Sequence, residues 1–359
     1  MPITWMKSPL SPWQQELGPC ADVVLDSRIR LVRNLKEYVF PFRASENELA
    51  AVCQIGKSRL AALDVLGHGT YSYISLANID SKERELLVAR HMASAACIAN
   101  PIYRALMVRD DGAVSIMINE TAHFCIQTVT SGLNLERVWE DASQIDDTLE
   151  SQLNMAFHDE FGYLTSSPFL TGTGLIAGVT LHVPALVSMK RIHRIVQGII
   201  QFGFTVCGVY GDRNEPIGSV FQIANQVTLG VKEEDVLKQL DKIVRQVVKE
   251  EQTCRSLLQQ QYEDELKDTF HRAEGILTHA YLMEEEEALR LAGELRLAVI
   301  QQEADYELQV YDALTTSITP AFLQFFQEKE LTEQELNRQR AVMIQRVLND
   351  YAKPVCVGM

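Results

Sequence analysis

Arg28 and Arg30, together with a Gly-Thr-Gly turn at residues 172–174, are the residues of this chain best suited to chemistry on a phosphate. Two arginines separated by one residue in an extended segment lie on the same face of a strand, where each guanidinium can bind phosphate oxygens in pairs. The glycines of such a turn let backbone N–H groups approach the same anion. The glycine turn, however, lies in a stretch from Phe161 to Met189 without Lys, Arg, Asp or Glu. The pattern indicates a nucleotide loop that lacks the cations a polyphosphate requires.

The elements that would position these residues alternate between strand and helix signals from residue 21 to residue 230. Asp111-Gly112 separates two apolar runs, which is a strong signal for an antiparallel hairpin. Capping boxes that begin at Ser45 and at Asp80 predict helices that run to about residue 60 and about residue 98. Further strands are expected at 71–76, 124–129, 179–183, 204–210 and 220–224, and further helices at 146–158 and 185–202. These signals predict a mixed α/β domain with a largely antiparallel sheet.

After residue 231 the sequence changes to long helical periodicity with few glycines or prolines. We therefore divide the chain into an N-terminal segment at 1–20, an α/β domain at 21–250 and a C-terminal all-helical domain at 251–359. Acidic residues are concentrated in the helical domain. The run Glu284–Glu287 is most simply the solvated start of a helix, and the alternative is a docking site for a basic partner.

Composition excludes several classes of protein. The net charge of -15 and pI of about 5.0 argue against nonspecific binding of nucleic acid or of an anionic membrane. The uncharged stretch 161–189 is long enough to span a bilayer, but Pro168, Pro184 and its glycines indicate buried strand and loop. Seven scattered cysteines without a CxxC motif indicate neither a disulfide framework nor a zinc module, and a reducing cytoplasm fits them best. We expect a cytoplasmic globular protein with no metal site.

Four segments resemble the ATP:guanidino phosphotransferases, or phosphagen kinases, and most closely their bacterial protein-arginine kinase branch, McsB. They are DSRIRLVRN at 26–34, INETAHFCIQ at 118–127, FGYLTSSPFLTGTGL at 161–175, and VCGVYGDRNEPIGSVFQIANQVTLG at 206–230. The resemblance extends over nearly the whole chain. It implies an α+β phosphagen-kinase catalytic-type domain, with helices flanking the sheet, followed by the helical domain. It also implies transfer of the γ-phosphoryl group of Mg-ATP to a guanidinium nitrogen, in this branch that of protein arginine.

The family surrounds the ATP phosphates with five arginines, because phosphoryl transfer depends on positioning and charge stabilisation. By the resemblance, Arg28 and Arg30 match the first two of these arginines. The third, fourth and fifth positions are occupied here by Cys125, Ile176 and Cys207. Three of the five cations are therefore absent.

The catalytic carboxylate of the family is also replaced. The family segment Asn-Glu-Glu-Asp-His-x-Arg places its usual catalytic glutamate where this chain has Thr121, and Ser167 replaces the cysteine that precedes the glycine turn. Glu120 and Asp212 are the carboxylates that could still anchor a guanidinium. Glu120 is expected to point to the opposite face if its segment is extended. The degenerate family positions are Thr121, Cys125, Ser167, Ile176 and Cys207.

The resemblance also implies a set of ATP-binding residues, for which plainer roles stay open. Arg28 and Arg30 could be salt-bridged strand residues, and His91, expected on a helix near the adenosine, could be merely packed or solvated. Arg90, Lys190 or Arg213 could supply a substitute cation. The ATP-binding set is Ser27, Arg28, Arg30, His91, Gly172, Thr173, Gly174, Gly208 and Gly211.

Two further motifs have alternative explanations. Cys125 and Cys207 replace arginines that converge on the phosphates in the family, so the two thiols could share one pocket as a redox pair or soft-metal site. Independent neutral replacement is the simpler explanation. At 336–341 the sequence LNRQRA stands where the branch has an Arg-Asp-x-x-Arg-Ala motif for phosphoarginine, with Arg340 and Ala341 in place. We expect a solvated amphipathic helix there.

Loss of the carboxylate and three cations, with the fold-forming residues in place, predicts a pseudokinase that acts as a protein-binding module in protein quality control. The alternatives are an active protein-arginine kinase with a diverged site and an ATP-sensing switch without turnover. By the resemblance alone, the expected partners are a second copy of the chain, a zinc-binding activator protein and a Clp-type chaperone-protease. Protein arginine is expected as a substrate only if activity remains, and Mg-ATP is the cofactor only if nucleotide binds.

Overall fold

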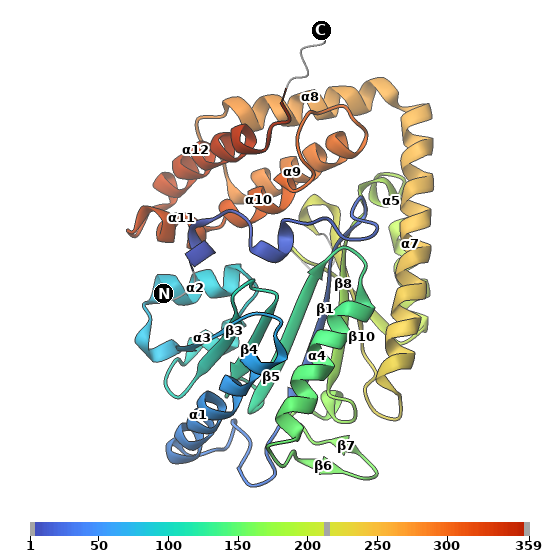
Figure 1. Cartoon of the computed structure of the whole chain (residues 1–359). Coiled ribbons are helices and arrows are strands. Elements are labelled where there is room, and N and C mark those ends of the chain that lie inside the picture. Colours follow the sequence, from blue (N-terminus) through green and yellow to red (C-terminus); the bar gives the residue numbers. More distant parts are fainter. Residues whose placement is uncertain (1–3, 212–215, 355–359) are drawn as a thin grey trace.

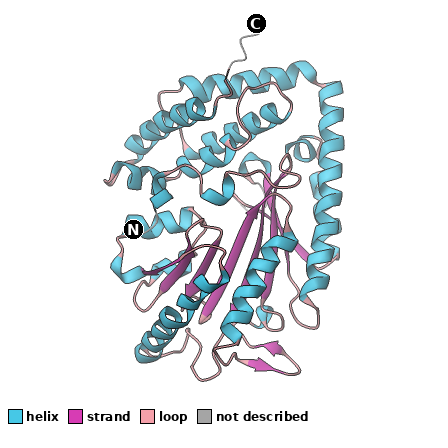
Figure 2. Ribbon diagram, in the orientation of Figure 1, coloured by secondary structure: helices cyan, strands magenta, loops and turns pink. Residues whose placement is uncertain are grey.

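The computed structural model describes residues 4–211 and 216–354, and it contains one large sheet with helices on both faces (Figure 1, Figure 2). The sheet has eight strands in the order β2-β3-β4-β5-β1-β8-β10-β9, and every neighbouring pair is antiparallel. A separate pair, β6 and β7, forms a small hairpin. The α/β class with a largely antiparallel sheet is confirmed. The strands are β1 (Val24–Arg33), β2 (Tyr71–Ser75), β3 (Ala105–Arg109), β4 (Val114–Ile118), β5 (Phe124–Ser131), β6 (Phe157–His158), β7 (Gly162–Tyr163), β8 (Leu175–His182), β9 (Phe204–Gly208) and β10 (Val220–Asn225).

Several helices begin at a residue whose side chain accepts a hydrogen bond from a free backbone N–H group of the first turn. The capping boxes at Ser45 and Asp80 are confirmed, and Thr332 forms a third. The α-helices before the C-terminal part are α1 (Glu46–Leu60), α2 (Ser81–Ala89), α3 (Ala95–Ala99), α4 (Leu135–Glu150), α5 (Pro184–Ser188) and α6 (Ile192–Gln201). Short 3₁₀ helices are η1 (Thr4–Lys7), η2 (Pro12–Gln14), η3 (Ala61–Leu66), η4 (Leu76–Asn78), η5 (Pro168–Leu170) and η6 (Ile217–Ser219).

Alternation along the strands gives the sheet two different faces. On β1, Ile29 and Leu31 are fully buried in an aliphatic core with α1, α4 and α7 (Glu233–Gln261), and we call this side the helix face. The residues that alternate with them, Arg28 and Arg30, point to the other side, which we call the cleft face. The N-terminal segment, α2, α3 and the C-terminal helices lie over the cleft face. One strand thus contributes alternately to the core and to the candidate site.

The C-terminal part is entirely helical, as expected. Its helices after α7 are α8 (Glu263–His279), α9 (Glu285–Ile300), α10 (Val310–Ser317), α11 (Pro320–Gln327) and α12 (Glu333–Tyr351). In Figure 1, α7 runs continuously from beside the sheet to this helical part. The expected domain boundary at residues 250 and 251 therefore falls inside one helix, where no linker separates the two parts.

Three sequence expectations about helices are wrong. The helix expected at 146–158 is α4, which begins at Leu135 and ends at Glu150. The helix expected at 185–202 is interrupted between α5 and α6, where Lys190 has a φ of 57°. The helix expected from Asp80 to about residue 98 ends at Ala89, so His91 lies in a turn with a φ of 57°. Left-handed residues of this kind give no reliable signal in a single sequence.

The expectation for the uncharged stretch is confirmed in part. It forms η5, the glycine turn, the buried strand β8 and the short helix α5. Within the described ranges 4–211 and 216–354, no helix combines the length and the apolar character needed to cross a lipid bilayer.

Candidate functional site

Strand register brings the five phosphate-arginine positions onto the cleft face. Arg30 pairs with Gln127 on β5 and with Ile176 on β8, and Val32 pairs with Cys125. Toward the β9 edge of the sheet, Asp26 on β1 pairs with Thr180 on β8. Thr180 pairs with Gln222 on β10, and Gln222 pairs with Cys207 on β9. Because Arg28, Arg30, Cys125, Ile176 and Cys207 all occupy positions that alternate with core residues, they share one surface.

Arg30 is neutralised within the chain. Its NH2 atom donates to Glu120 Oε2 at 2.6 Å, and its Nε atom donates to Cys125 Sγ at 2.6 Å. The Glu120 carboxylate also accepts hydrogen bonds from the Ser94 hydroxyl and from the backbone N–H and hydroxyl of Thr121. Burial raises the pKa of Glu120, but the charge of Arg30 and these hydrogen bonds outweigh burial and lower the pKa to about 2.

The expectation that Glu120 points away from the cleft face is wrong. Asn119 has a φ of 58°, so residues 119–123 form a tight turn between β4 and β5 and do not continue the strand. The turn directs the Glu120 carboxylate back to Arg30. Thr121, the degenerate catalytic position, is exposed in the same turn and contacts Ser166 through its carbonyl oxygen.

Arg28 is neutralised in the same way. Its Nε atom donates to Asp26 Oδ1 at 2.7 Å, and both residues belong to β1. Asp26 was not among the sequence candidates, although a signal existed, because residues two apart on a strand lie on one face. Both family arginines of this chain therefore have a carboxylate partner, which is the salt-bridged alternative that the sequence left open.

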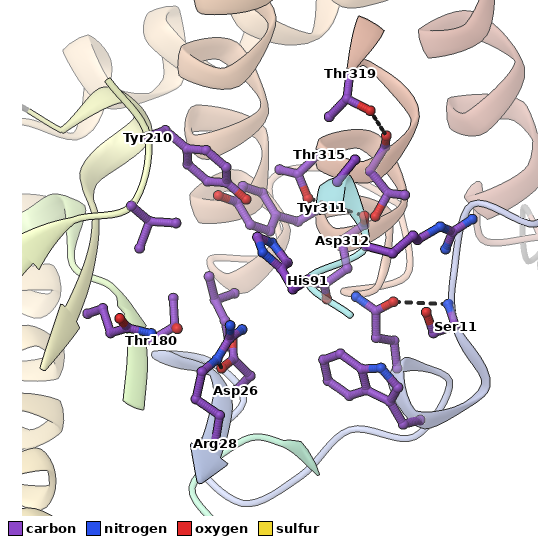
Figure 3. Close-up of a pocket in the computed structure, with 18 of the residues that line it drawn as sticks. Ser11, Asp26, Arg28, His91, Thr180, Tyr210, Tyr311, Asp312, Thr315 and Thr319 are labelled. Atoms are coloured by element: carbon purple, nitrogen blue, oxygen red, sulfur yellow. Dashed lines mark hydrogen bonds and ion pairs between the residues drawn. The ribbon is translucent and has the colours of Figure 1, made fainter. Parts of the chain in front are cut away.

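A cavity of about 530 Å³, which we call the cleft, opens between the sheet, the N-terminal segment and α10. Figure 3 shows side chains from the sheet, from the turn after α2 and from α10 pointing toward one another. The cleft contains Arg28, His91, Cys207 and Gly208 from the sequence candidates. It also contains residues with no sequence signal, which are Ser11, Trp13, Thr180, Tyr210, Gln222, Tyr311, Asp312 and Thr315.

The cleft disfavours charge on several of the groups that line it. Burial inside the cleft and the guanidinium of Arg28 together lower the pKa of His91 to about 4, against the opposing charge of Asp26, so the imidazole is neutral at pH 7. Burial raises the pKa of Asp312 to about 6, against the opposing charge of Arg296, and raises that of Tyr210 to about 12. A site of neutral hydroxyls, an imidazole, aromatic rings and carboxylates suits a polar ligand of low negative charge.

A second, smaller hollow of about 200 Å³ lies on the sheet between the two arginines. Gln127 and Gln222 line it with amide groups, and Ile176 lines it with an aliphatic side chain where the family has an arginine. Amides are neutral donors, and hydrogen bonds to phosphate are strongest when the donor is charged. The surface beside Arg28 and Arg30 is therefore poorly matched to a triphosphate.

The glycine turn lies away from the cleft, beyond the opposite end of β1. Gly172 N–H donates to Tyr163 O, and Thr173 N–H donates to Thr228 O, so these backbone groups are already paired. A Cβ on Gly172, whose φ is 119°, would lie 2.2 Å from the oxygen of Thr228, and one on Gly174 would lie 2.7 Å from an Arg33 nitrogen. Close packing of the chain accounts for both glycines without a phosphate.

The remaining candidates lie outside the cleft or outside the described residues. Ser27 is fully buried on the helix face, where its hydroxyl donates to Gly132 O. Ser167 occupies the N-cap position of η5 without a side-chain capping hydrogen bond, and Gly211 pairs with Pro216 at an exposed turn. Asp212 and Arg213 lie outside the described residues, so nothing about their roles follows from the structure.

Of the substitute cations, the structure describes Arg90 and Lys190, and neither is placed to serve a phosphate. The guanidinium of Arg90 borders the cleft but donates to the carbonyl oxygens of Met6, Ser8 and Pro9, and burial lowers its pKa to about 10. Lys190 is exposed in the turn between α5 and α6.

Cys125 and Cys207 do not share a pocket. Four strand spacings separate β5 from β9 in the sheet order, which places the thiols about 19 Å apart or more. A disulfide requires Cα atoms closer than about 7 Å. Burial raises the pKa of the Cys125 thiol, although Arg30 opposes this. The redox-pair alternative is therefore wrong, and independent neutral replacement accounts for both residues.

The cleft face does not fit Mg-ATP. Its two family arginines are paired with Asp26 and Glu120, and the other three positions carry an aliphatic group and two thiols. Among the residues that the structure describes, no group of three or more His, Cys, Asp or Glu is arranged to hold a metal ion.

Arg340 is a structural residue. It is 2% exposed, and its guanidinium donates to Ile318 O and Met283 O, which ties α12 to α10 and to the segment before α9. The expectation of a solvated helix at 336–341 is therefore wrong for Arg340. Burial of an arginine requires such carbonyl partners.

Two family profiles match most of the chain. The profile described as ATP:guanido phosphotransferase, C-terminal catalytic domain, matches residues 54–254, and the profile described as protein-arginine kinase McsB C-terminal domain matches residues 263–357. The chain is 35% identical over 348 residues to a protein-arginine kinase of Shouchella clausii, with 96% of each chain covered. It is 38% identical over 341 residues to a protein-arginine kinase of Halothermothrix orenii, with 95% of this chain and 97% of the relative covered.

Solved structures share the fold at low identity. A crystal structure of lombricine kinase gives a TM-score of 0.58 at 21% identity and covers 68% of this chain and 71% of its own. The duplicated taurocyamine kinase from Schistosoma mansoni gives a TM-score of 0.56 at 20% identity, over 67% of this chain and 34% of its own. At these identities the likeness describes the architecture alone.

Proposed function

This chain belongs to the ATP:guanidino phosphotransferase family, in its protein-arginine kinase branch, and from that premise we propose that it is a pseudokinase. In this proposal the chain has lost phosphoryl transfer and acts in the cytoplasm as a regulatory, protein-binding module of protein quality control. The sheet, its helices and the C-terminal part form the scaffold that partners recognise.

The observation that carries the proposal is the pairing of both family arginines with carboxylates of the same chain, at 2.7 Å for Arg28 with Asp26 and 2.6 Å for Arg30 with Glu120. A triphosphate would have to compete with Asp26 for Arg28 and with Glu120 for Arg30. The three absent arginines remove about 5–9 kcal/mol more, at about 1.5–3 kcal/mol for each hydrogen bond to a charged group. That corresponds to roughly 10⁴- to 10⁶-fold in binding or rate.

The proposed partners follow from family membership and charge. They are a second copy of the chain, contacted through the helical part, a zinc-binding activator protein and a Clp-type chaperone-protease. A net charge of -15 disfavours nucleic acid and anionic membranes as partners.

Transfer of radiolabelled phosphate from ATP to an arginine-rich protein, run beside a thermal-shift titration with Mg-ATP, tests the proposal. We expect no transfer above an Arg28→Ala control and no shift of the melting temperature. Transfer that depends on Arg28 would instead assign the chain as an active protein-arginine kinase with a diverged site. A nucleotide-dependent shift without transfer would assign it as an ATP-sensing switch.

A further inference from the structure

A groove of about 1210 Å³ lies between α6 and the start of α9, on a part of the molecule separate from the cleft. Its floor is apolar and is formed by Val187, Val196, Val206, Ile217 and Phe221. We call it the α6–α9 groove. Grooves with an apolar floor exclude water from side chains that enter them, and this contributes most of the affinity of a docked segment.

The apolar floor continues along α6 beyond the groove. Ile192, Val196 and Ile200 are spaced four residues apart and therefore form one row on the helix surface. Ile200 is 53% exposed, so this end of the row is accessible to solvent. Phe202, just after the helix, is 64% exposed. The groove and the row together form an elongated apolar surface, which suits a segment of chain better than a compact ligand.

One wall of the groove is acidic. Glu284, Glu286, Glu287 and Glu294 line it from α9 and the residue before it. Across the described residues 4–211 and 216–354, none of these four carboxylates has an ion-pair or hydrogen-bond partner. Arg290 is the cation among the lining residues, and His193 is the remaining titratable group. The wall therefore carries a net negative charge that the chain itself does not neutralise.

The nearby charges support an external cation as the missing partner. Burial raises the pKa of Glu294, although the guanidinium of Arg290 opposes this. A carboxylate in this position is stabilised when a Lys or Arg side chain approaches it. A second copy of this chain, with its own charge of -15, would bring charge of the wrong sign, and so would the headgroups of an anionic membrane.

We infer that the α6–α9 groove docks a basic amphipathic segment of a partner protein. Apolar side chains of that segment pack on Val196, Val206 and Phe221, and its Lys or Arg side chains pair with the carboxylates on the α9 wall. The acidic wall sets orientation and association rate, and the apolar floor sets the lifetime of the complex. This inference rests on the protein-binding role proposed above and assigns that role to one surface. Peptide binding tests the surface and phosphate transfer tests the pseudokinase proposal, so the two can fail separately.

The test uses the full chain and a fluorescein-labelled amphipathic peptide with Leu on one face and Lys on the other. Binding is measured by fluorescence anisotropy, with a peptide that carries Glu in place of Lys as the comparator. We expect the Lys peptide to bind and the Glu peptide not to bind. A higher salt concentration should weaken the binding of the Lys peptide. The variant Glu286→Lys/Glu287→Lys should weaken binding about tenfold or more.

Matched controls separate the groove from general acidity. Asp264→Lys/Glu265→Lys makes the same change of charge at an exposed acidic helix start on α8 and should leave the affinity unchanged. Val196→Ser tests the floor and should also weaken binding, with circular dichroism to verify folding. Failure of the wild-type chain to bind the Lys peptide would overturn the inference, as would equal losses in the Glu286/Glu287 variant and the α8 control. Sedimentation that shows self-association abolished by Val196→Ser would assign the groove to a second copy of the chain.

Discussion

The two faces of the central sheet are built from the same strands but tolerate change differently. On the helix face, Ile29, Leu31 and their neighbours pack against α1, α4 and α7 in a continuous aliphatic core. On the cleft face, three of five phosphate-arginine positions carry neutral residues. Because alternation separates the two sets of side chains, substitutions on the cleft face leave the core contacts intact. Side chains on the cleft face can therefore change while the framework of the fold stays the same.

Ion pairs on the two faces show the same difference. On the helix face, Arg33 of β1 pairs with Asp146 of α4, and their side chains are 1% and 9% exposed. On the cleft face, the Arg28 and Arg30 side chains are 23% and 28% exposed. Loss of the carboxylate partner costs more free energy for a buried guanidinium than for one that water can solvate. This gradient predicts an order for the effects of removing each carboxylate.

Asp146→Ala should have the largest effect. It leaves the buried Arg33 guanidinium with the carbonyl oxygens of Val32 and Thr173 and the ring of Tyr163 as its neighbours. The free energy of unfolding, measured by urea denaturation, should fall by about 3–5 kcal/mol. The double variant Arg33→Leu/Asp146→Leu should be less destabilised, because it removes the charge with its partner. A loss below about 1 kcal/mol for Asp146→Ala would contradict the distinction between the faces.

Glu120→Gln should have an intermediate effect that depends on pH. The pKa of Glu120 is about 2 in the folded chain, below its ordinary value of 4.5, so its ionised form stabilises the fold. Above pH 4.5 this contribution is complete, at about 3 kcal/mol, and it is lost as the pH falls from 4.5 to about 2.

The difference in unfolding free energy between wild type and Glu120→Gln measures that contribution. It should be constant from pH 7 to pH 5 and should shrink toward zero near pH 2, because the wild-type carboxyl then becomes neutral like the glutamine. A difference that stays unchanged between pH 5 and pH 3 would show that Arg30 does not hold this carboxylate in its ionised form.

Asp26→Asn should have the smallest effect on stability, below about 1 kcal/mol, because its pair with Arg28 is partly exposed. The same change releases the Arg28 guanidinium toward the cleft, so the affinity for pyrophosphate should rise about tenfold. Isothermal titration calorimetry measures this gain. Asp22→Asn, which changes a carboxylate paired with Arg255, is the matched control and should give no gain.

Local patterns in the sequence predict much of this fold. The capping box at Ser45 and the Asp111-Gly112 hairpin are correct because each depends on residues within one turn. The placement of Arg28 and Arg30 on one face is correct for the same reason. Errors arise where a single left-handed residue redirects the chain, as at His91 and Asn119. Such residues change the direction of a segment without changing its hydrophobic pattern.

The partners of the candidate site are less predictable. Asp26 could be found by alternation on β1, but the contact between Arg30 and Glu120 joins residues 90 positions apart. Asp312 reaches the cleft because α10 packs over the sheet, and no local pattern indicates that packing. The family resemblance identifies which cations are missing. Only the tertiary structure shows that the two family arginines in this chain, Arg28 and Arg30, already have carboxylate partners.

The 29-residue helix α7 has a mechanical consequence. It lies on β8 and β10 near its start, and near its end Arg255 donates to Asp22 O on the chain segment before β1. Because α7 is a continuous helix that packs on the rest of the chain, it offers proteases no flexible linker between the sheet and the C-terminal helices. A binding partner that displaces the C-terminal helices would therefore displace the sheet with them, through α7.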